Sequence, residues 1–450
     1  MTTLRPVKGL AWKCLWPNST RVPSQKPREI AARVLCQWDQ ERVTAETLLS
    51  DALNGLPVPD RGLCQELVLG VIRHRAWLDW LITQKVDGRR QQPLPLILLR
   101  LGLYQIFHLD RVPDHAAVNE TVAIAQRYDL GNQRGFINAV LRNCLREKEL
   151  WQERLALLRK NQPAIGYSHP QWLVQRWQDR WPNYASLLEW NNQPASVCAR
   201  RNTQTTSVES LEAQWAQECL GFERLKFSWL KEGLMFRIKP KGSPAALPSF
   251  QEGKFYIQDP STIASVQELD PRPEENILDL CAAPGGKTTA IAQRMQDIGS
   301  ILATDIDDSR LDRLRENIER LGLRSIQPKA LHQIDLKTAG PFDRILVDAP
   351  CSNTGVMRRR VDVRWRLNAS ELPVLARAQI NLLQRAAPLL KPGGILVYST
   401  CSIEAEENED VVTAFLRKHR NFRQETSRTL TPMQNGVDGA FVARLRREQH

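Results

Sequence analysis

The sequence has no pair of cysteines separated by two residues, and no secretory signal precedes its nine cysteines. The missing Cys-x-x-Cys pairs argue against zinc ribbons and thioredoxin-type chemistry, and no metal site is predicted. An odd cysteine count without a signal favours reduced thiols, so we expect a cytoplasmic location. Because no uncharged apolar run reaches about 18 residues, neither a transmembrane helix nor a membrane partner is expected.

Acidic residues are outnumbered by basic ones, 50 to 62, which gives a formal net charge of +12 and a pI near 9.4. This excess favours a polyanionic partner, most often nucleic acid, although a basic protein without such a partner can have the same composition. Residues 1–26 hold basic residues and no acidic ones. We expect them to form a disordered basic leader, with an RNA-contacting tail or an organelle transit peptide as alternatives.

Tryptophan is nearly absent from the last 200 residues, where only Trp365 is found, and this shift marks a boundary in composition. Residues 27–150 carry apolar side chains at helical spacing, which predicts an all-α bundle of about five helices. Residues 151–250 are mixed and predict a small α+β domain that ends in a glycine- and proline-rich linker, Lys239–Pro248. Residues 251–450 are predicted to form the last domain.

Short apolar strands alternate with amphipathic helices in residues 251–450. This alternation predicts a Rossmann-like α/β domain, with a mostly parallel sheet covered by helices on both faces. The predicted strands are Asn276–Leu280, Ser300–Thr304, Arg344–Val347 and Gly394–Tyr398. The predicted helices are Thr288–Gln296, Ser309–Leu321, Leu372–Leu390 and Glu406–His419.

The segment Ile277–Thr289 reads ILDLCAAPGGKTT and places a glycine-rich turn between a strand and a helix. Such a turn lets a ligand approach the backbone and the free N–H groups of the new helix. A Walker A phosphate loop would need glycine where Cys281 stands, and the dinucleotide fingerprint lacks its third glycine. S-adenosylmethionine needs less glycine, but it needs a carboxylate for its ribose at the end of the next strand.

Asp305 is that carboxylate in our interpretation, because it follows the next predicted strand about 20 residues after the loop. The alternative for Asp305 is a helix cap, since a helix begins shortly after it. Asp335 follows a third, weaker strand and is predicted to contact the adenine amino group.

Two cysteines follow predicted strand ends, Cys351 in Asp-Ala-Pro-Cys and Cys401 in Tyr-Ser-Thr-Cys. A lone cysteine is usually a small buried hydrophobe. The carboxyl ends of parallel strands, however, are where α/β sheets place active sites. Methylation of pyrimidine carbon 5 requires a thiolate that adds to carbon 6, which makes carbon 5 nucleophilic. Sites that methylate exocyclic nitrogens usually carry Asp/Asn-Pro-Pro-aromatic, whose second proline is replaced here by Cys351.

A run of arginines around Trp365 follows the Cys351 segment. Arginines and an aromatic ring beside a site suit a phosphate backbone and a flipped base. A solvated basic loop is the alternative. The residues are Arg358, Arg359, Arg360, Arg364 and Arg366.

Three segments, Asp279–Thr288, Asp348–Ser352 and Tyr398–Ser402, resemble the motifs of the RNA cytosine-5 methyltransferases of the RsmB/NOP/Sun group. Gln258-Asp259 and Glu407-Asn408 fit the same pattern.

The front of the chain resembles the NusB-like RNA-binding helical domain of bacterial Sun-type enzymes, through Ala117–Glu120 and Phe136–Arg142. The middle, around Pro170–Trp172 and Arg201-Asn202, resembles the small α+β domain of the same enzymes. This architecture implies small-subunit (16S) ribosomal RNA as the substrate.

The resemblance implies Cys401 as the nucleophile and Cys351 as the residue that helps to release the product. It also implies that Asp348 contacts the base near the cofactor and that Lys287 lies near both. Three residues depart from the family pattern. Asn353 stands where the family usually has a small residue, Val361 replaces a proline, and Ala440 replaces an aromatic residue. The predicted contacts of S-adenosylmethionine are Cys281, Ala282, Ala283, Pro284, Gly285, Gly286, Lys287, Asp305, Asp335 and Asp348.

The sequence therefore predicts a monomeric, S-adenosylmethionine-dependent enzyme that makes 5-methylcytosine in small-subunit ribosomal RNA. One alternative is the same chemistry on tRNA, against which the NusB-like front argues. Another is a non-catalytic RNA-binding or ribosome assembly factor, against which the retained cysteines, lysine and aspartates argue. A phosphate-loop ATPase is the third, and Cys281 argues against it.

Overall fold

The computed structural model describes residues 26–86, 91–334 and 336–449. The chain divides into two compact units, Met1–Asn192 and Gln193–His450. Apart from Lys26, the predicted basic leader lies outside the described residues, and so does Asp335. Within the described part of the chain, no helix is both long enough and apolar enough to cross a membrane.

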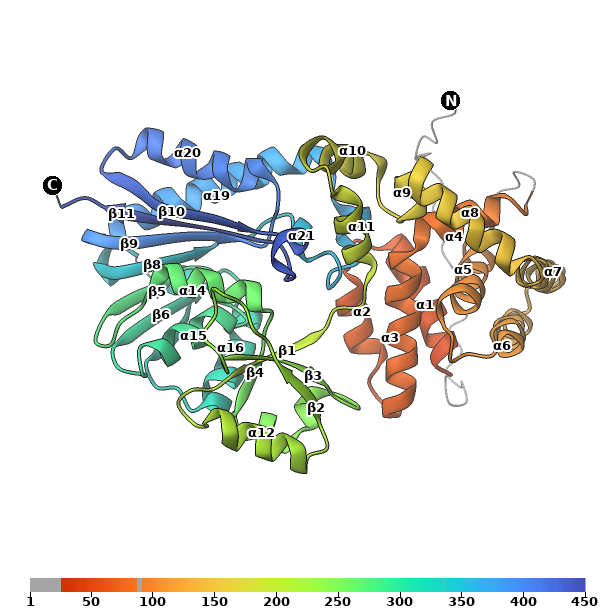
Figure 1. The fold of residues 1–450 in the computed structure, drawn as a ribbon, viewed down its shortest axis with the longest axis horizontal. Coiled ribbons are helices and arrows are strands. Elements are labelled where there is room, and N and C mark those ends of the chain that lie inside the picture. The colour runs from red at the N-terminus through yellow and green to blue at the C-terminus, as the bar shows by residue number, and fades with distance from the viewer. Residues whose placement is uncertain (1–25, 87–90, 335, 450) are drawn as a thin grey trace. The chain divides into compact units, whose positions relative to one another are not determined.

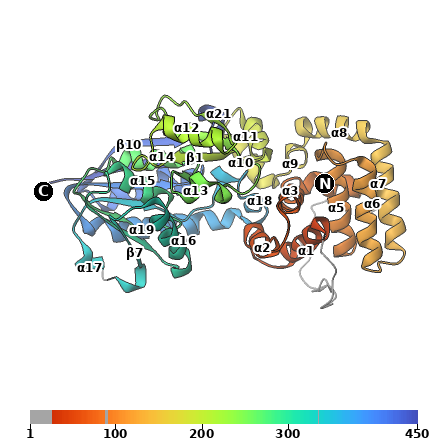
Figure 2. The same ribbon diagram turned by 90° about the horizontal axis from the view of Figure 1, so that it is seen from below.

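The first unit is all-helical and is built around α5 (Pro93–His108), in which every residue from 97 to 106 is buried. A helix that is buried all round lies at the centre of a bundle, and Figure 2 shows its neighbours packed along it. Gly102 allows the close approach of α7, because a Cβ there would lie 2.7 Å from Leu141. The other helices are α1 Pro27–Gln40, α2 Ala45–Ala52, α3 Val58–Arg73, α4 Arg75–Thr83, α6 Asp114–Arg127, α7 Gln133–Arg146, α8 Lys148–Asn161, α9 Pro163–Gly166, α10 Gln171–Arg180 and α11 Tyr184–Asn192.

The second unit begins with a four-stranded antiparallel sheet in the order β2-β3-β1-β4. Trp215 of α12 is fully buried against Phe222, Phe236 and Phe255 of this sheet. The segment Lys239–Pro248, interpreted from the sequence as a linker, connects β3 to α13 and then β4 within this layer. Glycine and proline therefore mark a turn here. The elements are β1 Val197–Arg201, α12 Val208–Gln217, β2 Gly221–Arg224, β3 Met235–Lys239, α13 Pro248–Gln251 and β4 Phe255–Ile257.

A seven-stranded sheet follows in the order β10-β11-β9-β8-β5-β6-β7. Strands β7, β6, β5, β8 and β9 are parallel to one another, and β11 runs antiparallel to both of its neighbours, β9 and β10. The strands are β5 Asn276–Asp279, β6 Ser300–Asp305, β7 Ile326–Ala330, β8 Phe342–Asp348, β9 Leu390–Thr400, β10 Phe422–Leu430 and β11 Ala440–Arg447.

Helices cover both faces of this sheet: Figure 1 shows α19 and α20 on one face and α14, α15 and α16 on the other. The central parallel strands are rich in buried Ile, Leu and Val because neither face meets solvent. The predicted Rossmann-like fold is confirmed. The helices are α14 Ile263–Leu269, α15 Gly286–Arg294, α16 Asp308–Leu321, α17 Leu336–Ala339, α18 Val363–Arg366, α19 Leu372–Ala386, α20 Glu409–Lys418 and α21 Pro432–Asn435.

Candidate active site

The predicted cofactor loop connects β5 to α15. Its backbone is held by the neighbouring strand, since Ala282 N donates to Thr304 O at 2.8 Å. Gly285 is the N-cap of α15 and has φ 103°, a conformation that glycine adopts without strain. At Gly286, a Cβ would lie 3.2 Å from Gln258 Nε2 and 3.3 Å from the Tyr256 ring. The turn into α15 therefore requires glycine at Gly285 for its conformation and at Gly286 for the close approach of Gln258 and Tyr256.

Asp305 ends β6 and is buried beside this loop. Its Oδ2 accepts a hydrogen bond from Ala283 N at 3.2 Å, and its Oδ1 lies 3.3 Å from Arg310 Nη1. The helix cap is Asp307, whose Oδ1 accepts from Ser309 N at 2.9 Å. The cap of α16 is therefore Asp307 and not Asp305, and Asp305 lies beside the predicted cofactor loop.

Asp279, a residue of the predicted cofactor motif without a predicted role of its own, is the last residue of β5 and almost fully buried. Its Oδ2 accepts from the Thr288 hydroxyl at 2.7 Å. Burial raises the pKa of Asp279 to about 7, against the effect of that hydrogen bond. Among the described residues, Asp279 Oδ1 and Gln258 Oε1 are buried without a hydrogen-bond partner. Two such acceptors near the glycine-rich loop fit a ligand that carries N–H or O–H donors.

Lys287, in the first turn of α15, reaches the end of β8. Its Nζ lies 2.6 Å from Asp348 Oδ2, and the Ser399 hydroxyl donates to Asp348 Oδ1 at 2.8 Å. Burial lowers the pKa of Lys287, but the Asp348 carboxyl outweighs it, so the net shift is upward. The structure therefore joins two predicted site residues from separate motifs as an ion pair.

The two predicted catalytic cysteines meet at the ends of neighbouring parallel strands, β8 and β9. Cys351 Sγ and Cys401 Sγ are 3.3 Å apart. The loop after Cys351 is tied to the Cys401 segment, because Gly355 N donates to Cys401 O at 3.0 Å. Ser352 Oγ and Ser402 Oγ are also within hydrogen-bond distance, 3.1 Å apart. These contacts hold the two thiols as a fixed pair.

The three cysteines of the site differ in their acidity. The hydrogen bond from Cys351 lowers the pKa of the Cys401 thiol, with help from Lys287 and against burial. The same hydrogen bond, followed by burial, raises the pKa of Cys351 well above its ordinary value. Burial also raises the pKa of Cys281. Because the thiolate is the form that acts as a nucleophile, these directions favour Cys401 as the nucleophile over Cys351 and Cys281.

Glu407 anchors both cysteine segments from the end of the short helix η7 (Ala405–Glu407). It is fully buried, and its Oε1 accepts from Ser352 N at 2.8 Å and from Gln379 Nε2 at 3.0 Å. Its Oε2 accepts from the hydroxyls of Ser352 and Ser402. This anchoring role could not be predicted from the sequence, where Glu407 only fits the family pattern, because the partners of its carboxylate lie on three other segments.

Glu407→Ala is expected to destabilise the second unit, because it leaves the buried Ser352 N–H without its acceptor and removes one acceptor each from Gln379 Nε2 and from the Ser352 and Ser402 hydroxyls. Each unpaired buried donor costs about 1–3 kcal/mol, so we expect a loss of about 3 kcal/mol or more. Urea denaturation followed by tryptophan fluorescence measures it. Glu448→Ala, at an exposed glutamate, is the matched control. Equal midpoints for the two variants would contradict the anchoring role.

The arginines that follow Cys351 do not all face solvent as predicted. Arg358 is buried and pairs with Asp438, and Arg359 binds Asp438 Oδ2 at 2.6 Å and Asp259 Oδ2 at 2.8 Å. Both are held by carboxylates, because a buried guanidinium requires paired charge. Arg358 is therefore too buried to serve as the predicted RNA contact, whereas Arg359 is partly exposed and Arg360 is exposed, so their role stays a prediction.

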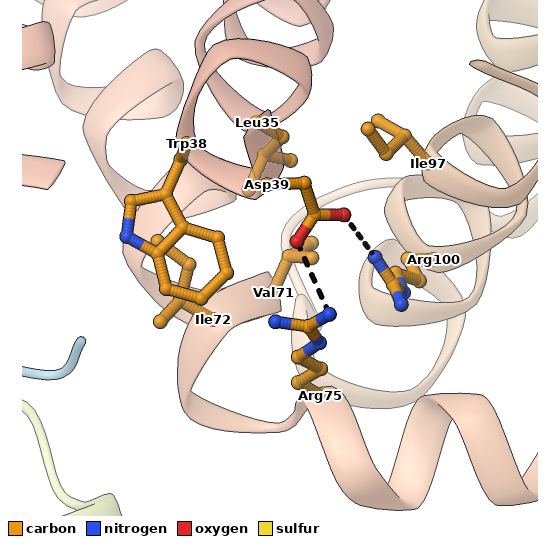
Figure 3. Close-up of a pocket in the computed structure, with 8 residues that line it drawn as sticks. All are labelled: Leu35, Trp38, Asp39, Val71, Ile72, Arg75, Ile97 and Arg100. Carbon is orange, nitrogen blue, oxygen red and sulfur yellow. Dashed lines mark hydrogen bonds and ion pairs between the residues drawn. The ribbon is translucent and has the colours of Figure 1, made fainter. Parts of the chain in front are cut away.

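A second cluster of charged side chains lies in the helical unit, around a small pocket between α1, α3 and α5 (Figure 3). Asp39 binds Arg100 Nη1 at 2.9 Å and Arg75 Nη2 at 3.2 Å, and Arg100 Nε also binds Asp79 at 2.6 Å. The charged side chains at this pocket form ion pairs with one another, and the other side chains that line it are apolar. We interpret this cluster as structural. Those apolar lining residues are Leu35, Trp38, Val71, Ile72 and Ile97.

Three family models match separate parts of the chain. Residues 266–446 match the model for 16S rRNA methyltransferase RsmB/F. Residues 25–146 match the NusB family, and residues 169–237 match the ferredoxin-like domain of RsmF/B-like methyltransferases.

Curated relatives are similar over almost the whole chain. The ribosomal RNA small subunit methyltransferase B of Escherichia fergusonii is 36% identical and is aligned over 93% of this chain and 98% of its own. The enzyme of the same name from Pasteurella multocida is 34% identical and is aligned over 93% of this chain and 96% of its own. Among solved structures, a methyltransferase homolog protein from Pyrococcus horikoshii is 30% identical, with a TM-score of 0.55 over 63% of this chain and 97% of its own.

Proposed function

Since this chain belongs to the RsmB/F family of 16S rRNA methyltransferases, we propose that it methylates carbon 5 of a cytosine in small-subunit ribosomal RNA, with S-adenosylmethionine as methyl donor. One observation carries the proposal: two thiols 3.3 Å apart at the ends of β8 and β9, beside a glycine-rich loop. Methyl transfer to pyrimidine carbon 5 needs a thiol nucleophile, whereas direct methylation of an exocyclic nitrogen does not.

The residues of the loop suit the methyl donor. When bound, S-adenosylmethionine supplies a methyl group on an electron-poor sulfonium. The unpaired Asp279 Oδ1 is a free acceptor for an ammonium group, and Asp305 is the candidate acceptor for ribose hydroxyls. The residues from Cys281 to Lys287 would surround the same ligand, and Asp335 stays our candidate for the adenine amino group.

Cys401 acts as the nucleophile in this proposal. Its thiolate adds to carbon 6 of the cytosine, which forms an S–C6 bond and moves electron density to carbon 5. Carbon 5 then takes the methyl group as the donor's sulfur–methyl bond breaks. A base removes the proton from carbon 5, and the electron pair of that C–H bond restores the ring double bond as the S–C6 bond breaks. The thiolate of Cys401 is regenerated.

Cys351, Asp348 and Lys287 support these steps. Cys351 lies next to the sulfur that must leave, and we assign it to product release. Asp348 is placed to hydrogen-bond the ring as charge develops, which stabilises the transition state. Lys287 holds the Asp348 carboxyl at 2.6 Å and so orients it between the loop and the thiols.

RNA is the expected partner of the helical unit as well. Its α7 exposes Arg134, Arg142 and Arg146. Arginine side chains on one surface helix neutralise phosphates without reading sequence, which positions a nucleic acid for the catalytic unit.

The proposal is tested by transfer of labelled methyl from S-adenosylmethionine to unmodified 16S ribosomal RNA, followed by nucleoside analysis. We expect label in 5-methylcytosine. Unmodified tRNA is the parallel substrate, and label in tRNA alone would replace ribosomal RNA as the substrate. Label in a methylated exocyclic nitrogen would overturn the carbon-5 chemistry.

A further inference from the structure

Asn353 lies beside the two proposed catalytic cysteines, at a position where the family usually has a small residue. Its Nδ2 donates to the carbonyl oxygen of Cys351 at 2.8 Å. Its Oδ1 accepts from the Cys401 thiol, with a sulfur–oxygen distance of 3.2 Å. One amide side chain therefore contacts both members of the pair.

The orientation of this amide follows from its partners. A carbonyl oxygen such as that of Cys351 can only accept, so the NH₂ group of Asn353 must face it and the amide oxygen must face Cys401. The backbone suits asparagine, since Asn353 has φ 60°, in the left-handed region that this residue type tolerates. The loop is fixed to the Cys401 segment through Gly355 and Ser352. The amide oxygen therefore faces the Cys401 sulfur in a fixed position.

We propose that Asn353 is a positioning residue that holds the Cys401 thiol through its amide oxygen and sets the pH at which Cys401 becomes nucleophilic. The inference rests on the proposed role of Cys401. An oxygen acceptor binds S–H and repels S⁻, so it favours the protonated form. It also points the S–H bond of Cys401 at Asn353, which leaves the sulfur lone pairs free on the side of Cys351.

Four further groups face the Cys401 sulfur. Cys351 donates to it, and Lys287 of α15 and the exposed Arg360 favour its thiolate through their positive charge. Asp348 at the end of β8 opposes the thiolate. The amide oxygen therefore disfavours the Cys401 thiolate, as the Asp348 carboxyl does, whereas Cys351, Lys287 and Arg360 favour it. Removing the Asn353 amide leaves these three groups in place, so the thiolate of Cys401 should form at a lower pH.

The test is the pH dependence of alkylation of Cys401 by iodoacetamide in the full chain, without RNA or S-adenosylmethionine. Mass spectrometry measures Cys401 and Cys351 separately, since they lie on different tryptic peptides. Asn353→Gly keeps the left-handed turn and removes the amide, so we expect the midpoint to fall by about half to one pH unit. Asn353→Asp places a second carboxyl near the sulfur, so we expect the midpoint to rise.

The control is Asn421→Ala, at an exposed asparagine of the same unit. Unchanged midpoints in Asn353→Gly and Asn353→Asp would overturn the inference and leave Asn353 as a turn residue. An equal shift in Asn421→Ala would overturn it too. If the parent chain transfers no methyl to RNA although the midpoints shift as expected, the proposed function fails while the contact with the thiol stands.

Discussion

Cys401→Ala is expected to lower the rate of methyl transfer to RNA by about 10⁴-fold or more, as the loss of a covalent nucleophile does. The reason is that carbon 5 of cytosine attacks a methyl group only after a thiolate has added to carbon 6. S-adenosylmethionine binding should persist, because Asp279 and the loop before α15 are untouched. Labelled methyl transfer and isothermal titration measure the two effects.

The matched control for Cys401→Ala is Cys219→Ala, at an exposed cysteine of the same unit that contacts no site residue. We expect that variant to keep full activity. Turnover by Cys401→Ala comparable to that of Cys219→Ala would remove Cys401 as the nucleophile.

Cys351→Ala is expected to trap a covalent complex between the protein and RNA. Cys401 can still add to carbon 6 and the methyl group can still be transferred, but the neighbouring thiol needed to release the product is gone. Denaturing gel electrophoresis with labelled RNA detects the complex as a slowly migrating band. Multiple turnover should be lost, since each protein molecule remains bound to its first product.

The double variant Cys351→Ala with Cys401→Ala is the control for this trap, and its band should disappear. A band that persists in the double variant would show attachment through another residue. The opposite pattern, a band with Cys401→Ala and none with Cys351→Ala, would exchange the roles of the two cysteines. The gel distinguishes the two assignments of nucleophile and release residue, which the distance alone does not, because the two sulfurs are only 3.3 Å apart.

The fold class could be predicted from the sequence because it depends on local patterns. The apolar segments that became β5, β6, β8 and β9 are interrupted by helices at regular intervals, and only a parallel sheet accommodates that alternation. The family resemblance, carried by three motifs, is confirmed by relatives that match nearly the whole chain.

The place of the candidate site in the fold could also be predicted from sequence. The loop from Cys281 to Lys287 and the two cysteines each lie within a few residues of a strand end. Parallel strands bring their carboxyl ends to one edge of the sheet, so motifs 50 or more residues apart meet there. Cys351 and Cys401 are 50 residues apart in the chain and in contact in the fold.

Burial and pairing were decided only by the tertiary structure. Arg358 and Arg359 look like RNA contacts in sequence, but their carboxylate partner Asp438 lies 80 and 79 residues further along the chain. Asn353 looks like a departure from a family pattern, yet its amide contacts the thiol of Cys401. The sequence by itself determined which reactive residue types follow the strand ends, and these residue types are the basis of the proposed chemistry. Which side chains support that chemistry depends on contacts between distant segments, and these exist only once the chain is folded.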